Sequence, residues 1–266
     1  VKLLDPLVLI FLTSGLFLGW ALGANDAGNV FGTAVGTKMV SWRTAAIICS
    51  IFVVLGAIVS GAGTSQTLGK LGAISALPGA FMTALSAAFA VYAMTKFGLP
   101  VSTSQAIVGA IIGWNFFSNN PTDISTLTKI LSTWIICPLL SGVIAIFLYQ
   151  TIKFSAQRVH IHMIRADAYQ RVALIIAGAL GAYSLGANNI ANVVGVFIPA
   201  QPLPQVQIGG LLLSSTQQLF LLGGLSIALG VFTYSKRVMM TLGSDLGRLS
   251  ATSALIAVIS HSIVLF

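Results

Sequence analysis

The chain has 266 residues, of which 56% are hydrophobic and only 7% are charged, and it contains no glutamate. Ordinary soluble domains carry about 25% charged residues, so this chain lacks the polar side chains needed to cover a surface that faces water. Its formal net charge of +8 resides in short loops between apolar runs, a pattern of membrane topology signals rather than of a nucleic-acid-binding face. We therefore expect a multi-pass integral protein of the cell membrane.

Apolar runs follow one another along the whole chain. A membrane-spanning helix needs about 20 apolar residues, so these runs predict an all-α polytopic membrane protein. The predicted helical spans are 7–35, 44–62, 73–95, 99–118, 131–151, 172–197, 211–234 and 250–266. The most polar stretch is 153–171, in which four lysine or arginine residues face one acid, and the positive-inside rule places this stretch in the cytoplasm.

The first apolar run contains a polar, glycine-rich segment, Gly-Ala-Asn-Asp-Ala-Gly-Asn-Val-Phe-Gly-Thr, at 23–33. Its charged residue is Asp26, and a carboxylate at that depth costs about 2.5–3.5 kcal/mol on insertion scales. Such a cluster is stable in hydrocarbon where it lines a cavity and has a partner. Because the run is too long for one straight helix, we predict that the helix breaks at these glycines.

A second copy of this segment, Gly-Ala-Asn-Asn-Ile-Ala-Asn-Val-Val-Gly, lies at 186–195. Paired polar segments of this kind in two halves of a chain point to a transporter binding site. Together with Gly-Leu-Pro-Val-Ser-Thr-Ser-Gln at 98–105, the two copies resemble the inorganic phosphate transporters of the PiT type over most of the chain. The resemblance implies a phosphate symporter that works by alternating access, and a homodimer in which a transport part moves against a scaffold.

The two halves of the chain also repeat outside these motifs. Residues 41–69 align without gaps on 215–243, with an offset of 174, whereas the polar motifs align with an offset of 163. This divides the chain into a first repeat (1–152), a basic cytoplasmic linker (153–171) and a second repeat (172–266). By the repeat, a second serine-rich turn is due beyond Phe266, so we expect the second repeat to be incomplete at its C-terminal end.

Loop charges predict that the two repeats are inverted. The loop after the first motif contains Lys38 and Arg43, whereas 198–213 contains no charge. One loop further on, the first half has only Lys70, whereas the second half has Lys236, Arg237 and Arg248. Each cation-rich loop of one half thus aligns with a cation-poor loop of the other half, so the two halves have opposite orientations in the membrane. This requires an odd number of crossings in the first half and places the amino terminus outside.

The stretch 79–117 has two possible arrangements. Gly98 and Pro100 end one helix, and the serines and threonine at 102–104 can cap the next. Either two full crossings meet at the cytoplasmic face near Lys96, or a re-entrant hairpin carries its tip to mid-membrane. The family resemblance favours the hairpin, and Lys96 beside the tip favours the crossings; we expect the hairpin.

A helix that starts at Ser102, Thr103 and Ser104 presents free N–H groups, hydroxyl donors and the positive end of its dipole, and can therefore bind an anion. An ordinary helix cap is the alternative. Gln105 can add an amide donor or orient a hydroxyl. The predicted phosphate-binding residues are Asp26, Ser102, Thr103, Ser104, Gln105, Asn188 and Asn192.

Asp26 by itself would repel a bound phosphate, so a cation must stand between them. A sodium ion held by Asp26 and by asparagine oxygens satisfies both, and couples the binding of the two ions by linkage. The predicted sodium ligands are Asn25, Asp26, Asn29, Asn189 and Asn192. Two alternatives remain open: Asp26 takes up a proton as the coupling ion, or it caps a broken helix.

The second motif departs from the family pattern, because Asn189 occupies the position where the family usually has an aspartate. The loss of one carboxylate leaves the number and identity of the coupling ions open. No catalytic constellation or organic cofactor motif is visible, so we do not expect an enzyme. The competing functions are proton-coupled phosphate transport, sulfate transport and an uncoupled anion channel, and Asp26 in the pore argues against the channel.

Overall fold

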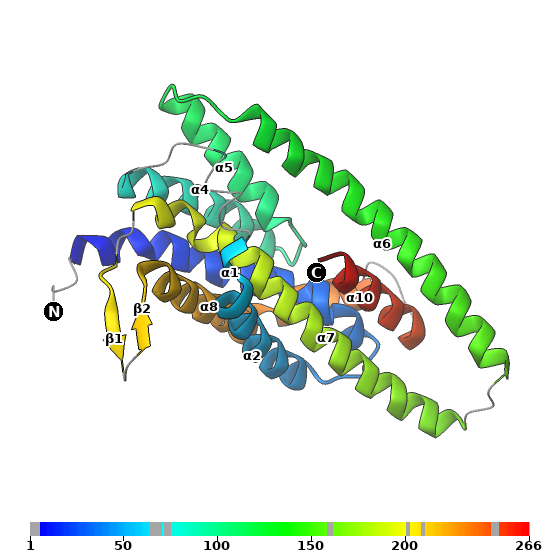
Figure 1. The fold of residues 1–266 in the computed structure, drawn as a ribbon. Helices are drawn as coiled ribbons and strands as arrows, with labels where there is room; N and C mark the ends of the chain where they lie inside the picture. Colours follow the sequence, from blue (N-terminus) through cyan, green and yellow to red (C-terminus); the bar gives the residue numbers. More distant parts are fainter. Residues whose placement is uncertain are drawn as a thin grey trace.

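The structure is a computed structural model, and it describes residues 6–63, 71, 76–158, 162–200, 203–208, 211–245 and 250–265. Its main elements are helices (Figure 1). They are α1 (Pro6–Gly36), α2 (Trp42–Ser60), α4 (Leu77–Lys96), α5 (Thr103–Phe117), α6 (Ile124–Arg158), α7 (Met163–Val194), α8 (Ser215–Tyr234), α9 (Lys236–Met240) and α10 (Ala251–Leu265). A 3-10 helix, Gly195–Ala200, follows α7, and a π-helical turn, Thr241–Asp245, follows α9.

The helices confirm the predicted spans in order and place. Within the described residues, six of them are long and apolar enough to cross a membrane: α1, α2, α4, α6, α7 and α8. The protein is therefore a multi-pass membrane protein. Between α7 and α8 the structure adds a small antiparallel hairpin of β1 (Val206–Ile208) and β2 (Leu211–Leu213), which the apolar pattern did not predict.

The predicted break in the first helix is wrong, because α1 is continuous from Pro6 to Gly36. Likewise α7 continues through its polar motif to Val194 and changes to a 3-10 helix only at Gly195. The glycines instead bring helices close together: a Cβ at Gly28 or Gly32 would press on Leu242, and one at Gly23 would collide with α8. An unbroken helix keeps its own backbone hydrogen bonds, which a break in hydrocarbon would leave unpaired.

The long helices of the two halves run in opposite directions. In Figure 1, α1 begins at the label N and runs toward the label C, whereas α7 runs back the other way. Each half packs its first helix against the second helix of the other half, so that α1 lies against α8 and α7 lies against α2. The sequence repeat matches α1 with α7 and α2 with α8, so these two helix pairs correspond to each other.

Glycines permit these two close helix contacts at equivalent positions of the repeats. A Cβ at Gly56 would collide with the carbonyl oxygen of Tyr183, and one at Gly230 would collide with that of Trp20. Adding 174 to Gly56 and 163 to Trp20 gives Gly230 and Tyr183, so the two contacts are copies of each other. This agreement supports the prediction of an inverted repeat.

The cation-rich loops lie at the same end of the molecule. The indole Nε1 of Trp42 donates a hydrogen bond of 3.2 Å to Ser235 Oγ, which joins the start of α2, directly after the loop that follows α1, to the residue that follows α8. Gly36 also meets Gly243, beyond α9. Lys38 and Arg43 belong to the loop after α1, and Lys236 and Arg237 belong to the segment after α8. The predicted topology places these two cation-rich segments on the same side of the membrane, so they must lie at the same end of the molecule.

The turn between α4 and α5 ends beside Asn25, eleven residues before the end of α1. Helix α5 has 15 residues and is about 22 Å long, shorter than the roughly 30 Å of a hydrocarbon core. Both observations fit a re-entrant hairpin better than two full crossings.

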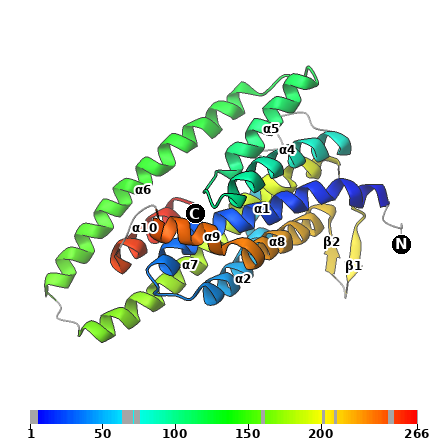
Figure 2. The ribbon, with the colours of Figure 1, turned by 180° about the vertical axis from the view of Figure 1, so that it is seen from behind.

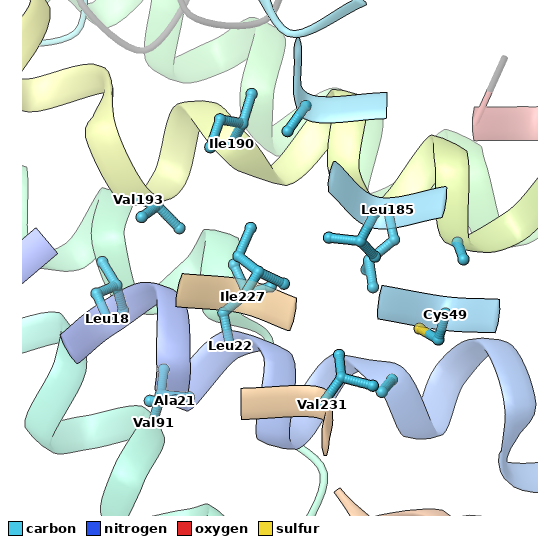
Figure 3. Packing of buried hydrophobic residues seen from close by; sticks show 14 of the residues in the cluster. Leu18, Ala21, Leu22, Cys49, Val91, Leu185, Ile190, Val193, Ile227 and Val231 are labelled. Carbon is cyan, nitrogen blue, oxygen red and sulfur yellow. The ribbon is translucent and has the colours of Figure 1, made fainter. Parts of the chain in front are cut away.

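The apolar core is formed by buried residues of α1, α2, α7 and α8, together with residues of α4 and α5 (Figure 3). Figure 3 shows Leu18 and Leu22 of α1 facing Val193 of α7 and Ile227 of α8. In contrast, α6 lies along the outside of the molecule (Figure 2) and leaves most of its apolar side chains exposed. Asp123 directly precedes α6. Its carboxylate accepts from the hydroxyl of Thr126 and from the backbone N–H groups of Thr126 and Ser125, and these bonds lower the pKa of Asp123.

We expect Gly56→Ala and Gly230→Ala to destabilise the protein to a similar extent. Each new Cβ meets a backbone carbonyl that cannot move by itself, and overpacking of this kind costs about 1–3 kcal/mol. Thermal unfolding in detergent measures the effect. Gly142→Ala on α6 is the control, because nothing lies within 4 Å of a Cβ there. Equal stability of all three variants would contradict the packing described above.

Candidate functional site

Asn25 of α1 holds the turn between α4 and α5. It is 1% exposed. Its Nδ2 donates to Thr95 Oγ1 and to the carbonyl oxygen of Leu99, and its Oδ1 accepts from the N–H of Val101, each at 2.9 Å. One buried amide thus satisfies main-chain groups that the turn leaves without a helical partner.

The turn itself brings α5 back toward α1. Gly98 adopts a positive φ of 76°, a conformation that glycine permits at little cost. Ser102 then caps α5, because its Oγ accepts from the N–H of Gln105 at 3.3 Å. The first residues of α5 are therefore Thr103 and Ser104, whose N–H groups have no partner within the helix.

Asp26 lies beside the start of α5. It is 5% exposed, and its Oδ1 is 3.5 Å from Thr103 Oγ1, the donor of a long hydrogen bond. Thr103 is itself 1% exposed. Among the residues that the structure describes, no cation forms an ion pair with Asp26. A buried carboxylate with only a neutral partner is costly, so this position attracts a proton or a cation.

Helix α7 approaches the start of α5 from the other half of the chain. Asn192 Nδ2 donates to Ser104 Oγ and to Asn189 Oδ1, both at 2.8 Å. Asn189 Nδ2 in turn donates to the carbonyl oxygen of Leu185 at 3.1 Å. The start of α5 therefore lies between the polar motif of α1 and the polar motif of α7.

The structure brings six of the predicted site residues into one connected region: Asn25, Asp26, Thr103, Ser104, Asn189 and Asn192. Asn188 is half-buried beside Asn189, whereas Asn29, Ser102 and Gln105 are exposed. Sequence reasoning missed Thr95, which accepts from Asn25 and donates to Val91. A threonine within the apolar run just before the Gly-Leu-Pro turn was the signal for it.

The region combines donors for an anion with oxygens for a cation. The first turn of α5 provides N–H groups, two hydroxyls and the positive end of a helix dipole. Asp26 provides a carboxylate on the α1 side, and Asn189 provides an amide oxygen on the α7 side. Fold and site thus define a multi-pass helical membrane protein with a buried polar contact between its two halves.

Comparisons with known proteins identify the family. The model of the "Phosphate transporter family" matches residues 22–166 and 156–266, and the chain therefore belongs to this family of transporters. It is 25% identical to the "Putative phosphate permease PYRAB14010" of Pyrococcus abyssi, over 94% of this chain and 80% of that protein. It is also 26% identical to the "Sulfate permease CysP" of Bacillus subtilis, over 88% of this chain and 64% of that protein.

A solved structure titled "The sodium-dependent phosphate transporter" has the same fold. It superposes with a TM-score of 0.80 at 22% identity, and the match covers 98% of this chain and 84% of that one. The predicted polytopic helical fold is therefore confirmed.

We expect Asn25→Leu to destabilise the protein by about 1–3 kcal/mol or more, since it removes the part-buried hydrogen bonds to the Leu99 carbonyl and the Val101 N–H and the buried one to Thr95. Thermal unfolding in detergent measures the loss. Asn29→Leu, one turn along α1 at an exposed position, is the matched control and should change stability little. If both variants unfold at the same temperature, Asn25 does not hold the turn.

Proposed function

We propose that this protein imports inorganic phosphate by symport with sodium, through a site formed where Asp26, the start of α5 and the asparagines of α7 meet. The observation that supports this most is the position of Asp26. A buried carboxylate lies beside a helix N-terminus that is suited to an anion, with no cation from the described residues between them. A cation from solution supplies the missing charge.

The anion is bound mainly by the start of α5. Thr103 and Ser104 contribute hydroxyls and unpaired N–H groups, and Asn192 contributes an amide donor from the other half. A phosphate oxygen can replace Ser104 Oγ as the acceptor for Asn192. Ser102 and Gln105 are exposed and contribute at the entrance, Ser102 chiefly as the helix cap.

The cation is bound by oxygen atoms on both sides of the anion. Asp26 supplies the charged ligand, and Asn189, Asn192 and Asn29 supply amide oxygens within the two motifs. Asn25 has both polar atoms engaged with the turn, so we assign it mainly to holding the turn. Sodium lowers the repulsion between Asp26 and the anion, and by linkage each ion then raises the affinity for the other.

The residues that bind the anion come from both halves of the chain, and this arrangement suits alternating access. Ser104 comes from the hairpin of the first half and Asn192 from α7 of the second, and one hydrogen bond joins them. A relative movement of the hairpin and α7 opens the site to one face of the membrane and closes it to the other.

Asp26→Asn should reduce sodium-driven phosphate accumulation in proteoliposomes by at least about tenfold. The substitution keeps the shape but removes the charge that binds the cation, and the loss of a charged interaction of about 1.4 kcal/mol or more corresponds to this factor. Asp123→Asn is the matched control, because Asp123 lies outside the membrane-spanning helices and caps α6; it should leave uptake unchanged.

The driving ion is decided in the same vesicles. Accumulation against a phosphate gradient that follows an imposed sodium gradient, and not a pH gradient, agrees with sodium symport. Accumulation that follows only the pH gradient assigns the role of coupling ion to a proton on Asp26. Phosphate flux that never exceeds equilibrium in either gradient refutes coupled transport.

Sulfate is the second candidate substrate, because one relative is named a sulfate permease. The carboxylate of Asp26 has two oxygen atoms, so one can bind the sodium ion while the other accepts a hydrogen bond from a protonated anion, which phosphate can be and sulfate at neutral pH cannot. We expect a tenfold excess of arsenate, which carries the same protons as phosphate, to inhibit phosphate uptake, and the same excess of sulfate to inhibit it little. Equal inhibition by both anions would contradict the assignment of phosphate.

A further inference from the structure

The side chain of Arg237, in α9, contacts the turn between α4 and α5. Its Nη1 donates a hydrogen bond of 2.8 Å to the carbonyl oxygen of Lys96, the last residue of α4. Carbonyl groups in the last turn of a helix lack helical partners and form the negative end of its dipole. A guanidinium group is therefore well suited to bind there, and the bond joins the second half of the chain to the turn.

Gly98 makes room for the arginine side chain. A Cβ at this position would lie 2.9 Å from Arg237 Nε, 3.1 Å from its Cγ and 3.3 Å from its Cδ. The side chain thus lies across the one residue of the turn that has no side chain of its own and that adopts a positive φ. Packing and hydrogen bonding together determine where this arginine lies.

The same turn carries the groups that the site uses. Leu99 and Val101 bond to Asn25, and Thr103 follows two residues later with its hydroxyl on Asp26. Thr103 follows Lys96 by only seven positions, so a displacement of the end of α4 changes the position of the start of α5. We propose that Arg237 is a positioning residue of the anion site, which it serves by fixing the turn; this inference rests on the proposed function.

The repeat supplies no equivalent of this arginine in the first half. Subtracting the offset of 174 from Arg237 gives Gly63, which is exposed and has nothing within 4 Å of an added Cβ. The bond from arginine to carbonyl is thus a feature of the cation-rich end of the molecule, where it restrains the hairpin tip. The two repeats therefore contribute differently to the site, because the first has Gly63 at the position equivalent to Arg237.

A purely electrostatic role is the competing explanation. Arg237 and Lys236 both line a cavity of about 640 Å³ beside Phe97, Gly98 and Leu99, and two cations there would attract anions toward the site. Lys236 is exposed, and its side chain forms no hydrogen bond with the described residues. It has the same charge and the same cavity, but no bond to the turn, and therefore serves as the matched control.

Hydrogen–deuterium exchange of the full-length protein in detergent, without phosphate, tests the position of the turn directly. We expect Arg237→Gln to speed exchange in the peptide that contains the Val101 amide by about tenfold, the effect of losing a charged hydrogen bond. Arg237→Lys, which keeps one donor, should show a smaller increase, and Lys236→Gln should match the wild type. Unchanged exchange in Arg237→Gln overturns the proposal.

Phosphate uptake by the same variants then tests the effect on the site. We expect Arg237→Gln to raise KM for phosphate about tenfold and Lys236→Gln to leave it unchanged. Equal increases in both variants would assign the effect to charge alone and overturn the proposal. If the wild type takes up no phosphate, the proposed function fails, whereas the exchange result still decides whether Arg237 fixes the turn.

Discussion

The structure depends on the hydrogen bonds that Asn25 forms inside the protein. This one amide satisfies a carbonyl and an N–H of the turn between α4 and α5 and also bonds to Thr95. The turn could not otherwise lie against α1 at this depth, because its main-chain groups would be unpaired in an apolar environment. With the turn in place, the start of α5 lies beside Asp26, and Asn192 of the α7 motif bonds to Ser104 at the same place, which forms the candidate site.

Close packing of helices from opposite halves provides the frame for this site. The contact of α2 with α7 and that of α1 with α8 both use a glycine opposite a backbone carbonyl, at positions that the repeat makes equivalent. Small residues at such contacts allow backbones to approach, which is a main source of stability where lipid removes the hydrophobic drive between helices. Neither half is complete without the other, since each supplies the partner of the other's motif-bearing helix.

The positions of the charged residues bear both on the membrane topology and on the candidate site. Among the residues whose burial is described, Asp26 is the one buried carboxylate, whereas Lys38, Arg43, Lys236 and Arg237 lie at the end where the segments after α1 and α8 meet. Arg237 belongs to this group and also bonds to the end of α4. Arg237 thus combines a place among the cations that predict the membrane orientation with a bond to the hairpin that carries the candidate site.

The sequence alone determined the positions of the long helices and identified the polar motifs. Apolar runs predicted each long helix because hydrocarbon requires about 20 such residues, and the cost of burying Asp26 identified the motif that carries the site. Only the tertiary structure decided what each polar and small residue contacts. The glycines of α1 suggested a broken helix, but they pack against α8, α9 and the π-helical turn in an unbroken one. The contacts of Thr95 and Arg237 could not be predicted from the sequence pattern, because their partners Asn25 and Lys96 lie 70 and 141 positions away. Composition along a chain does not specify which helices become neighbours.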